Sequence, residues 1–321
     1  MDLSEIYAPV RADLDALDAL LRRELASDDP FIGELVEYVL HTRGKLIRPA
    51  LVCLSAQASG GAGEPRLWIA AAVELIHIAS LIHDDIIDQS ALRRGTATVN
   101  AQWGNQIAVL LGDYLFAKAF DLISRARAVP VASAIAGAAV QMSQAEIMQI
   151  KYGSDPHEDE GVYLRIIAGK TAHLFSAACR AGALLAGNTA AATRLADYGL
   201  SWGMAFQITD DALDLISEPA ALGKPIHSDV SGGTVTLPVI HALRSASAPD
   251  RDRLVALLRG RRDGELGELD GLLRSYGGIR YALDVARRYS VQATASLAGL
   301  DDGPALRSLR ALTEFVTSRT S

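Results

Sequence analysis

Apolar positions recur along most of this 321-residue chain at the three-to-four-residue spacing of an amphipathic helix. No run alternates apolar and polar residues as a half-buried strand would. The pattern therefore predicts an all-α fold. Helices are expected at 3–26, up to His41, and over 48–58, 65–88, 99–127, 131–152, 158–186 and 188–218, with four or five shorter ones over 234–319.

The breaks in this pattern carry their own information. Pro30 suits the first turn of the second helix, and Asn188-Thr189 offers a helix cap. Residues 219–233 form the longest irregular segment. A loop of this length in a compact helical protein usually has a function. Because no Pro/Ser-rich linker and no repeat of fixed period divides the chain, residues 1–321 are expected to form a single domain.

Composition narrows the class of protein. Half the residues are hydrophobic but only 6% are aromatic, which favours a large helical core. A net charge of −7 without a basic block argues against nucleic acid as a partner. Cys53 and Cys179 lie in apolar runs and are expected to be buried thiols in a reducing compartment. With neither a secretory signal nor an uninterrupted 18-residue apolar stretch in view, a cytoplasmic protein without a membrane span is expected.

Candidate chemistry begins at the end of the 65–88 helix, with Asp84-Asp85-Ile86-Ile87-Asp88. Asp84 and Asp88 share one helix face, with His77 one heptad earlier, and like charges at this spacing repel by a few tenths of a kcal/mol. A second copy, Asp210-Asp211-Ala212-Leu213-Asp214, follows. A solvated helix face would explain one copy. With Asp about one residue in twenty, two copies by accident are on the order of one in a thousand.

These carboxylates predict a metal site with oxygen ligands only. No Cys or His set has zinc spacing, and Mg²⁺ prefers a few carboxylates, waters and phosphate oxygens. Two such clusters would hold several ions around a diphosphate. Basic residues beside glycines or helix ends fit that polyanion; they are Lys45, Arg48, Arg93, Arg94, Lys170 and Lys224. Each taken singly is also explained as a surface charge, except Arg93 and Arg94, which come just after the carboxylate helix. Walker A and G-x-G-x-x-G patterns, which indicate nucleotides, are absent.

With these residues assembled, the chain resembles the trans-isoprenyl (E-polyprenyl) diphosphate synthases of the bacterial medium- and long-chain type. The most specific matches are Asp84–Asp88 followed by Arg93-Arg94-Gly95, and the segment Phe206–Asp214; Gly112–Leu115, Glu146–Gln149 and Lys170-Thr171 also match. The resemblance implies an antiparallel helix bundle around a deep central cavity, the isoprenoid synthase type. It also implies a homodimer.

The resemblance further implies a reaction, in which an allylic diphosphate ionises, isopentenyl diphosphate attacks the cation, and a proton is lost. Three Mg²⁺ ions are expected on the metal ligands Asp84, Asp85, Asp88, Asp210, Asp211 and Asp214. The residues expected to bind the allylic diphosphate and to assist the departure of its diphosphate group are Arg93, Lys170, Thr171, Gln207 and Lys224. Isopentenyl diphosphate is assigned to Lys45, Arg48, His77 and Arg94; for His77 a buried core histidine is the alternative. Four positions depart from the family pattern, namely Arg43, Leu46, His227 and Thr234.

Product length is predicted from Ala79 and Ser80, which lie about one turn before Asp84. Small side chains there leave room below the metal site, and one helical turn of about 5.4 Å is roughly one extended isoprene unit. A medium-to-long product is therefore expected, released with a transient membrane contact; close helix packing is the other explanation for two small residues. The competing hypotheses are a geranylgeranyl or farnesyl diphosphate synthase, a class I terpene cyclase, and a non-catalytic subunit of a heteromeric synthase.

Overall fold

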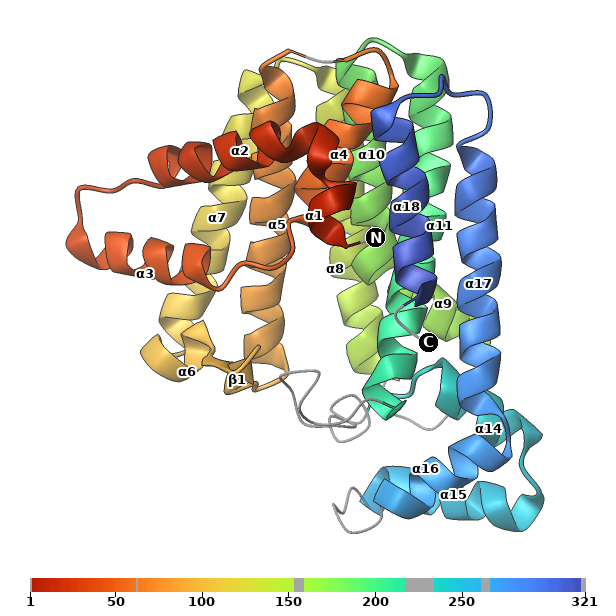
Figure 1. Ribbon diagram of the computed structural model, residues 1–321. Helices are drawn as coiled ribbons and strands as arrows, with labels where there is room; N and C mark the ends of the chain where they lie inside the picture. The colour runs from red at the N-terminus through yellow and green to blue at the C-terminus, as the bar shows by residue number, and fades with distance from the viewer. Residues whose placement is uncertain (1, 62, 153–158, 217–233, 261–265, 319–321) are drawn as a thin grey trace. The chain divides into compact units, whose positions relative to one another are not determined.

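The computed structural model describes residues 2–61, 63–152, 159–216, 234–260 and 266–318. These residues are almost entirely helical (Figure 1), so the all-α prediction is confirmed. They form two compact units. Unit 1 comprises Met1–Ala139, Leu174–Gly199 and Ala295–Leu312, and unit 2 comprises Val140–His173, Leu200–Thr294 and Thr313–Ser321.

The helices follow one another with short connections. Those of the first half of the chain are α1 (Leu3–Ile6), α2 (Arg11–Glu24), α3 (Pro30–His41), α4 (Ile47–Ala58), α5 (Pro65–Ile87), α6 (Val99–Trp103), α7 (Asn105–Arg125) and α8 (Val129–Tyr152). Those of the second half are α9 (Glu160–Ile167), α10 (His173–Leu185), α11 (Thr189–Ile216), α14 (Leu237–Ser245), α15 (Ala248–Gly260), α16 (Leu266–Ser275), α17 (Gly278–Ser296) and α18 (Pro304–Ser318). A two-stranded hairpin, β1 (Leu92–Arg93) and β2 (Thr96–Ala97), lies between α5 and α6 in the chain.

Three of the predicted helices are interrupted. The helix predicted over 158–186 is divided into α9 and α10 by a π-helical turn at Ala168–Ala172. The prediction of one helix over 3–26 is wrong because a 3₁₀ turn at Ala8–Val10 separates α1 from α2. This turn contains Pro9, which has no N–H to donate and whose ring clashes with the carbonyl four residues earlier. The prediction of one helix over 99–127 is wrong as well. Gly104 adopts φ 84° and ψ 162°, a conformation that glycine alone adopts readily, and so divides α6 from α7.

Two local predictions of helix starts are confirmed. Pro30 occupies the first turn of α3, where the Asp29 side chain accepts hydrogen bonds from the backbone N–H groups of residues 31 and 32. Asn188 Oδ1 accepts one from the Ala191 N–H, 2.9 Å away, at the start of α11. Both caps satisfy donors that the helix itself leaves open.

Helix α5 is the core element of unit 1, where it lies against α4 and α7 (Figure 1). Every residue from Ile69 to Ile76 is buried, as expected of a helix that is apolar on all sides. By length and composition α5 could cross a bilayer, but 61% of its most apolar stretch is buried inside the protein, which is typical of a core helix. Cys53 and Cys179 are both buried free thiols, as predicted.

Unit 2 has its own hydrophobic core. It joins residues of α9, α11 and α14 to α17, among them Met204, Ile208, Leu237, Leu254 and Leu273. The core fixes the C-terminal half of α11, which carries the second aspartate motif.

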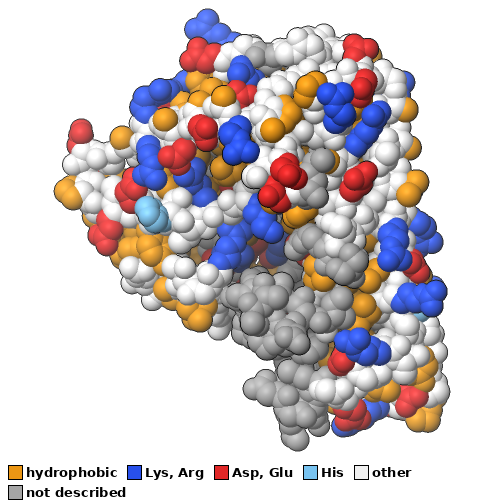
Figure 2. Space-filling view, viewed as in Figure 1, with side chains coloured by type: hydrophobic (Ala, Val, Ile, Leu, Met, Phe, Trp, Pro, Cys, Tyr) orange, Lys and Arg blue, Asp and Glu red, His pale blue; other side chains and the backbone are white. Residues whose placement is uncertain are grey.

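On the face drawn in Figure 2, basic and acidic side chains of the described residues are interspersed.

Candidate active site

The first aspartate motif lies at the C-terminal end of α5. Asp84 is half-buried, whereas Asp88 is exposed and caps the helix. The end of a helix where carbonyl groups are unpaired carries a partial negative charge, which favours cations. Two carboxylates one turn apart add to that charge. Their oxygen donors and position thus fit a hard divalent cation.

Asp85 faces a different environment from its two neighbours. Its side chain is only 7% exposed, and the Arg93 guanidinium binds it through Nε at 2.9 and 3.1 Å from the two carboxylate oxygens and through NH2 at 2.8 Å. Arg93 ends β1, and the two-residue turn Arg94-Gly95 leads into β2. Both turn residues have positive φ, 52° and 76°, as a type I′ hairpin requires. The hairpin therefore anchors Arg93 on the end of α5.

A cluster of positive charge surrounds His77, which lies half-buried two turns before Asp84. Burial, together with the charges of Arg48, Arg94 and Arg93, lowers the pKa of His77 well below 6.5. The imidazole is therefore neutral at pH 7 and offers one N–H as a donor. Arg48 stacks over the Phe175 ring at 4.3 Å from its centroid. Four of the residues predicted to bind diphosphate are thus brought together in unit 1.

The loop between α3 and α4 carries Lys45, which is exposed. The Tyr7 hydroxyl donates to the Lys45 carbonyl, 3.1 Å away, and so holds the loop from one side. Arg43, one of the departures from the family pattern, holds it from the other by donating to the Leu40 carbonyl at 2.8 Å and by pairing with Asp18. The network explains how a bulky arginine is accommodated at this position.

A buried carboxyl group, Glu74, lies within the electrostatic influence of Arg48, Arg43 and Arg94. It is 3% exposed, and burial raises its pKa while the nearby charges of Arg48, Arg43 and Arg94 oppose the shift. Glu74 lies about one turn before His77 on α5. Nothing in its sequence context distinguishes it from other helical glutamates, so the sequence-based prediction did not include it.

The two predicted chain-length residues differ in exposure. Ala79 is completely buried, as close helix packing would require. Ser80 is half-buried, and its hydroxyl donates to the His77 carbonyl at 2.8 Å. Of the two, Ser80 is the position where a larger side chain would reach beyond the helix packing.

In unit 2, Lys170 and Thr171 lie in a π-helical turn, Ala168–Ala172, between α9 and α10. Such turns insert an extra residue and are frequent at functional sites. Lys170 Nζ lies 2.8 Å from Glu146 Oε2, and the Thr171 hydroxyl donates to Gln207 Oε1 at 2.8 Å. The turn thus ties two predicted site residues to α8 and α11.

The second aspartate motif resembles the first in its first two carboxylates, but its last one, Asp214, is buried where Asp88 is exposed. Asp210 is half-buried, and the middle carboxylate, Asp211, is buried and bound by protein donors. Gln207 Nε2 donates to it at 2.7 Å and the Tyr163 hydroxyl at 2.6 Å. Asp214 is also buried. The sequence-based prediction missed Tyr163 because its partner lies 48 residues away in the chain.

Among the described residues, no three His, Cys, Asp or Glu side chains lie close enough together to hold one metal ion. Asp84 and Asp88 belong to unit 1, and Asp210 and Asp214 to unit 2. Lys224 and His227 lie outside the described residues, while Thr234 is half-buried. The metal ligands therefore remain a prediction, which the oxygen-only donor set of each motif fits.

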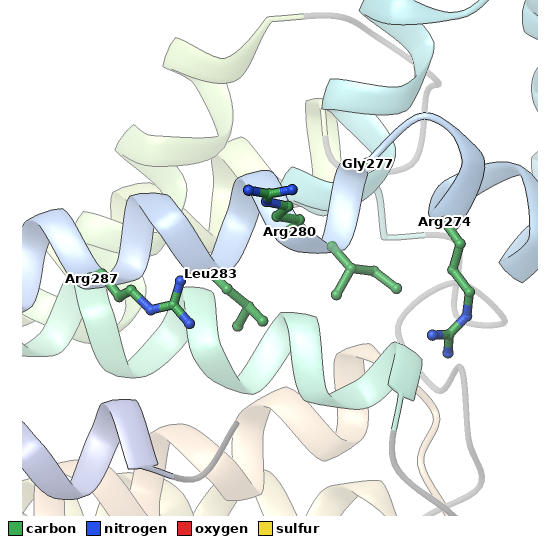
Figure 3. Close-up of a pocket in the computed structure, with 6 residues that line it drawn as sticks. Arg274, Gly277, Arg280, Leu283 and Arg287 are labelled. Atoms are coloured by element: carbon green, nitrogen blue, oxygen red, sulfur yellow. The ribbon is translucent and has the colours of Figure 1, made fainter. Parts of the chain in front are cut away.

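A separate surface pocket of about 460 Å³ occurs in unit 2 at the junction of α16 and α17 (Figure 3). Ile279 and Leu283 line it together with Arg274, Arg280 and Arg287. Asp270 and Asp284 pair with Arg274 and Arg287, each at 2.8 Å. None of the predicted site residues lines this pocket.

Comparisons with known proteins identify the family of the chain. Residues 29–275 match the family model "Polyprenyl synthetase". The chain belongs to the polyprenyl synthetase family. It is similar to the octaprenyl diphosphate synthase of Haemophilus influenzae, with 35% identity over 92% of this chain and 91% of that one. It is also similar to a short chain isoprenyl diphosphate synthase of Methanothermobacter thermautotrophicus, with 38% identity over 99% of both chains.

Among solved structures, a polyprenyl synthase of Caulobacter crescentus complexed with calcium and isoprenyl diphosphate has the same fold. The TM-score is 0.94 at 33% identity, covering 100% of this chain and 98% of that one. The chain is accordingly an enzyme of the trans-polyprenyl diphosphate synthase class, a prenyltransferase with the isoprenoid synthase fold.

Proposed function

We propose that this synthase condenses isopentenyl diphosphate with an allylic diphosphate to give a longer all-trans polyprenyl diphosphate. The observation that carries the proposal is the cluster of Arg48, Arg93 and Arg94 around a neutral His77, two turns from the Asp84–Asp88 helix end. Guanidinium groups bind phosphate oxygens through two parallel hydrogen bonds. Cationic groups for binding diphosphate thus adjoin carboxylates suited to a metal.

Lys45, Arg48, His77 and Arg94 hold isopentenyl diphosphate in this proposal. The allylic diphosphate is held by Arg93, Lys170, Thr171, Gln207 and Lys224. When bound, Mg²⁺ ions neutralise negative charge on the departing diphosphate, and three ions are proposed. The allylic C–O bond breaks, the double bond of isopentenyl diphosphate attacks the cation, and the proton lost next goes to the released diphosphate.

The outer and middle carboxylates take different roles. Asp84, Asp88, Asp210 and Asp214 are proposed as the metal ligands. Asp85, bound by Arg93, and Asp211, bound by Gln207 and Tyr163, were expected to be ligands too. Their protein contacts support a positioning role, in which each buried carboxylate orients a donor that faces the substrate.

A medium-to-long product is proposed because no bulky residue stands at Ala79 or Ser80, and an octaprenyl synthase is among the relatives. The short-chain relative at 38% identity keeps a shorter product as the alternative. A homodimer is proposed from exposed apolar residues on α7, where Leu110 is 64% and Phe120 46% exposed. The enzyme is expected in the cytoplasm as a single domain, with a transient membrane contact during product release.

The test is elongation itself. The purified protein with Mg²⁺ and isopentenyl diphosphate is expected to extend farnesyl or geranylgeranyl diphosphate, and chromatography sizes the product. Asp84→Ala and Asp210→Ala are expected to abolish turnover at unchanged helical content, whereas the matched control Asp15→Ala, at an exposed position of α2, retains it. Absence of elongation with every allylic primer would refute the proposal, and a product ending at C20 would refute the medium-to-long length.

A further inference from the structure

Gly44 lies in the loop before α4, directly under the side chain of Arg94. A Cβ atom placed on Gly44 would come within 2.7 Å of NH2, 2.9 Å of NH1 and 3.1 Å of Cζ of Arg94. Real Cβ atoms essentially never lie closer than 3.0 Å to such atoms, so the first two contacts cannot form without a shift. The space that a side chain would fill at residue 44 is therefore occupied by the guanidinium of Arg94.

The backbone explains why Arg94 reaches this place. Arg94 has φ 52°, a left-handed conformation forced by the two-residue hairpin turn, and NH1 donates to the Thr42 carbonyl at 3.2 Å. Gly44 itself does not have a left-handed φ. A glycine is therefore required at position 44 for space and not for backbone freedom.

We propose that Gly44 is a positioning residue whose missing side chain forms the seat of the Arg94 guanidinium. The seat holds Arg94 beside His77, whose pKa its charge helps to lower. The inference rests on the proposed function, in which Arg94 binds the diphosphate of isopentenyl diphosphate. Any side chain at residue 44 displaces the guanidinium and weakens that binding. The fold survives the change, because only the far end of a flexible side chain has to move.

The test is a steady-state comparison of Gly44→Ala, Arg94→Ala and the double variant. Gly44→Ala is expected to raise KM for isopentenyl diphosphate about tenfold, the effect of losing one charge-assisted hydrogen bond. KM for the allylic substrate stays within about twofold of wild type. The double variant matches Arg94→Ala alone, because residues that act through one contact are not additive. Gly33→Ala in α3 is the control, since no atom lies within 4 Å of its added Cβ.

A binding measurement separates this proposal from the proposed function. Inorganic pyrophosphate is titrated into each variant by calorimetry in the presence of EDTA, so that neither turnover nor metal is involved. Weaker binding by Gly44→Ala and Arg94→Ala, but not Gly33→Ala, supports the seat even if the wild type elongates nothing. Equal pyrophosphate affinity in all variants, multiplicative effects in the double variant, or loss of folding by Gly44→Ala would overturn it.

Discussion

The ion pair between Asp85 and Arg93 gives the sharpest prediction, because it assigns Arg93 a structural role in addition to substrate binding. The Asp85 side chain is 7% exposed and that of Arg93 28%, and three N···O distances lie between 2.8 and 3.1 Å. In Arg93→Ala the carboxylate would stay buried without its partner. If Arg93 served substrate binding alone, the same change would leave stability untouched.

The size of the effect follows from burial. Removing one partner of a fully buried pair costs about 3–5 kcal/mol, and exposed pairs contribute about 0–1 kcal/mol. Because water reaches part of Arg93, Arg93→Ala is expected to lower the free energy of unfolding by about 2–3 kcal/mol. Adding Asp85→Asn to this variant removes the unpaired charge and should restore about 1 kcal/mol or more of the free energy of unfolding.

The assay is urea unfolding followed by circular dichroism at pH 7 in low and moderate salt. The loss in Arg93→Ala should change little with salt, since a buried pair is weakly screened. Arg22→Ala is the matched control. Arg22 pairs with Glu37 and Asp18, and the side chains of all three residues are 41% to 55% exposed, so a loss of stability below about 1 kcal/mol is expected. Stability of Arg93→Ala within about 0.5 kcal/mol of wild type, or strict additivity with Asp85→Asn, would refute the reasoning.

Three other predictions concern single side chains. Tyr163→Phe removes a buried donor to the Asp211 carboxylate and should lower the free energy of unfolding by about 1.5–3 kcal/mol. The loss should exceed that of Tyr198→Phe, because the Tyr198 hydroxyl donates to a neutral backbone carbonyl. Equal losses in urea unfolding would contradict this. The lowered pKa of His77 means that the unfolded chain binds more protons below pH 6.5, so stability falls as pH drops from 6.5 towards the folded-state value, by at most about 1.4 kcal/mol per pH unit. His77→Gln should show a shallower fall between pH 7 and 5, and an unchanged slope would count against it. Ser80→Phe should shorten the main product while initial rates persist; chromatography showing the wild-type length would reject Ser80 as a chain-length residue.

Features set by neighbours in the sequence were predictable. The helical period gave the fold class, and Pro30 and Asn188 marked helix starts, because caps and propensities act within one turn. The spacing of Asp84 and Asp88 places them on one face of any helix, so a shared cation could be inferred before the fold was known. The errors were also local in origin, since Pro9 and Gly104 stand inside otherwise periodic runs and their breaking effect prevailed over the pattern.

The order of residues is enough to show which of them carry charge, offer oxygen donors or follow a helical period, but not which groups each carboxylate contacts. Asp84 and Asp85 are adjacent in the chain, yet only the hairpin that returns Arg93 to α5 distinguishes one from the other. Tyr163 joins Asp211, and Arg94 lies over Gly44, through contacts between distant segments. Such contacts depend on how side chains fill space after packing. No local propensity or spacing records them, so they became visible only in the folded chain.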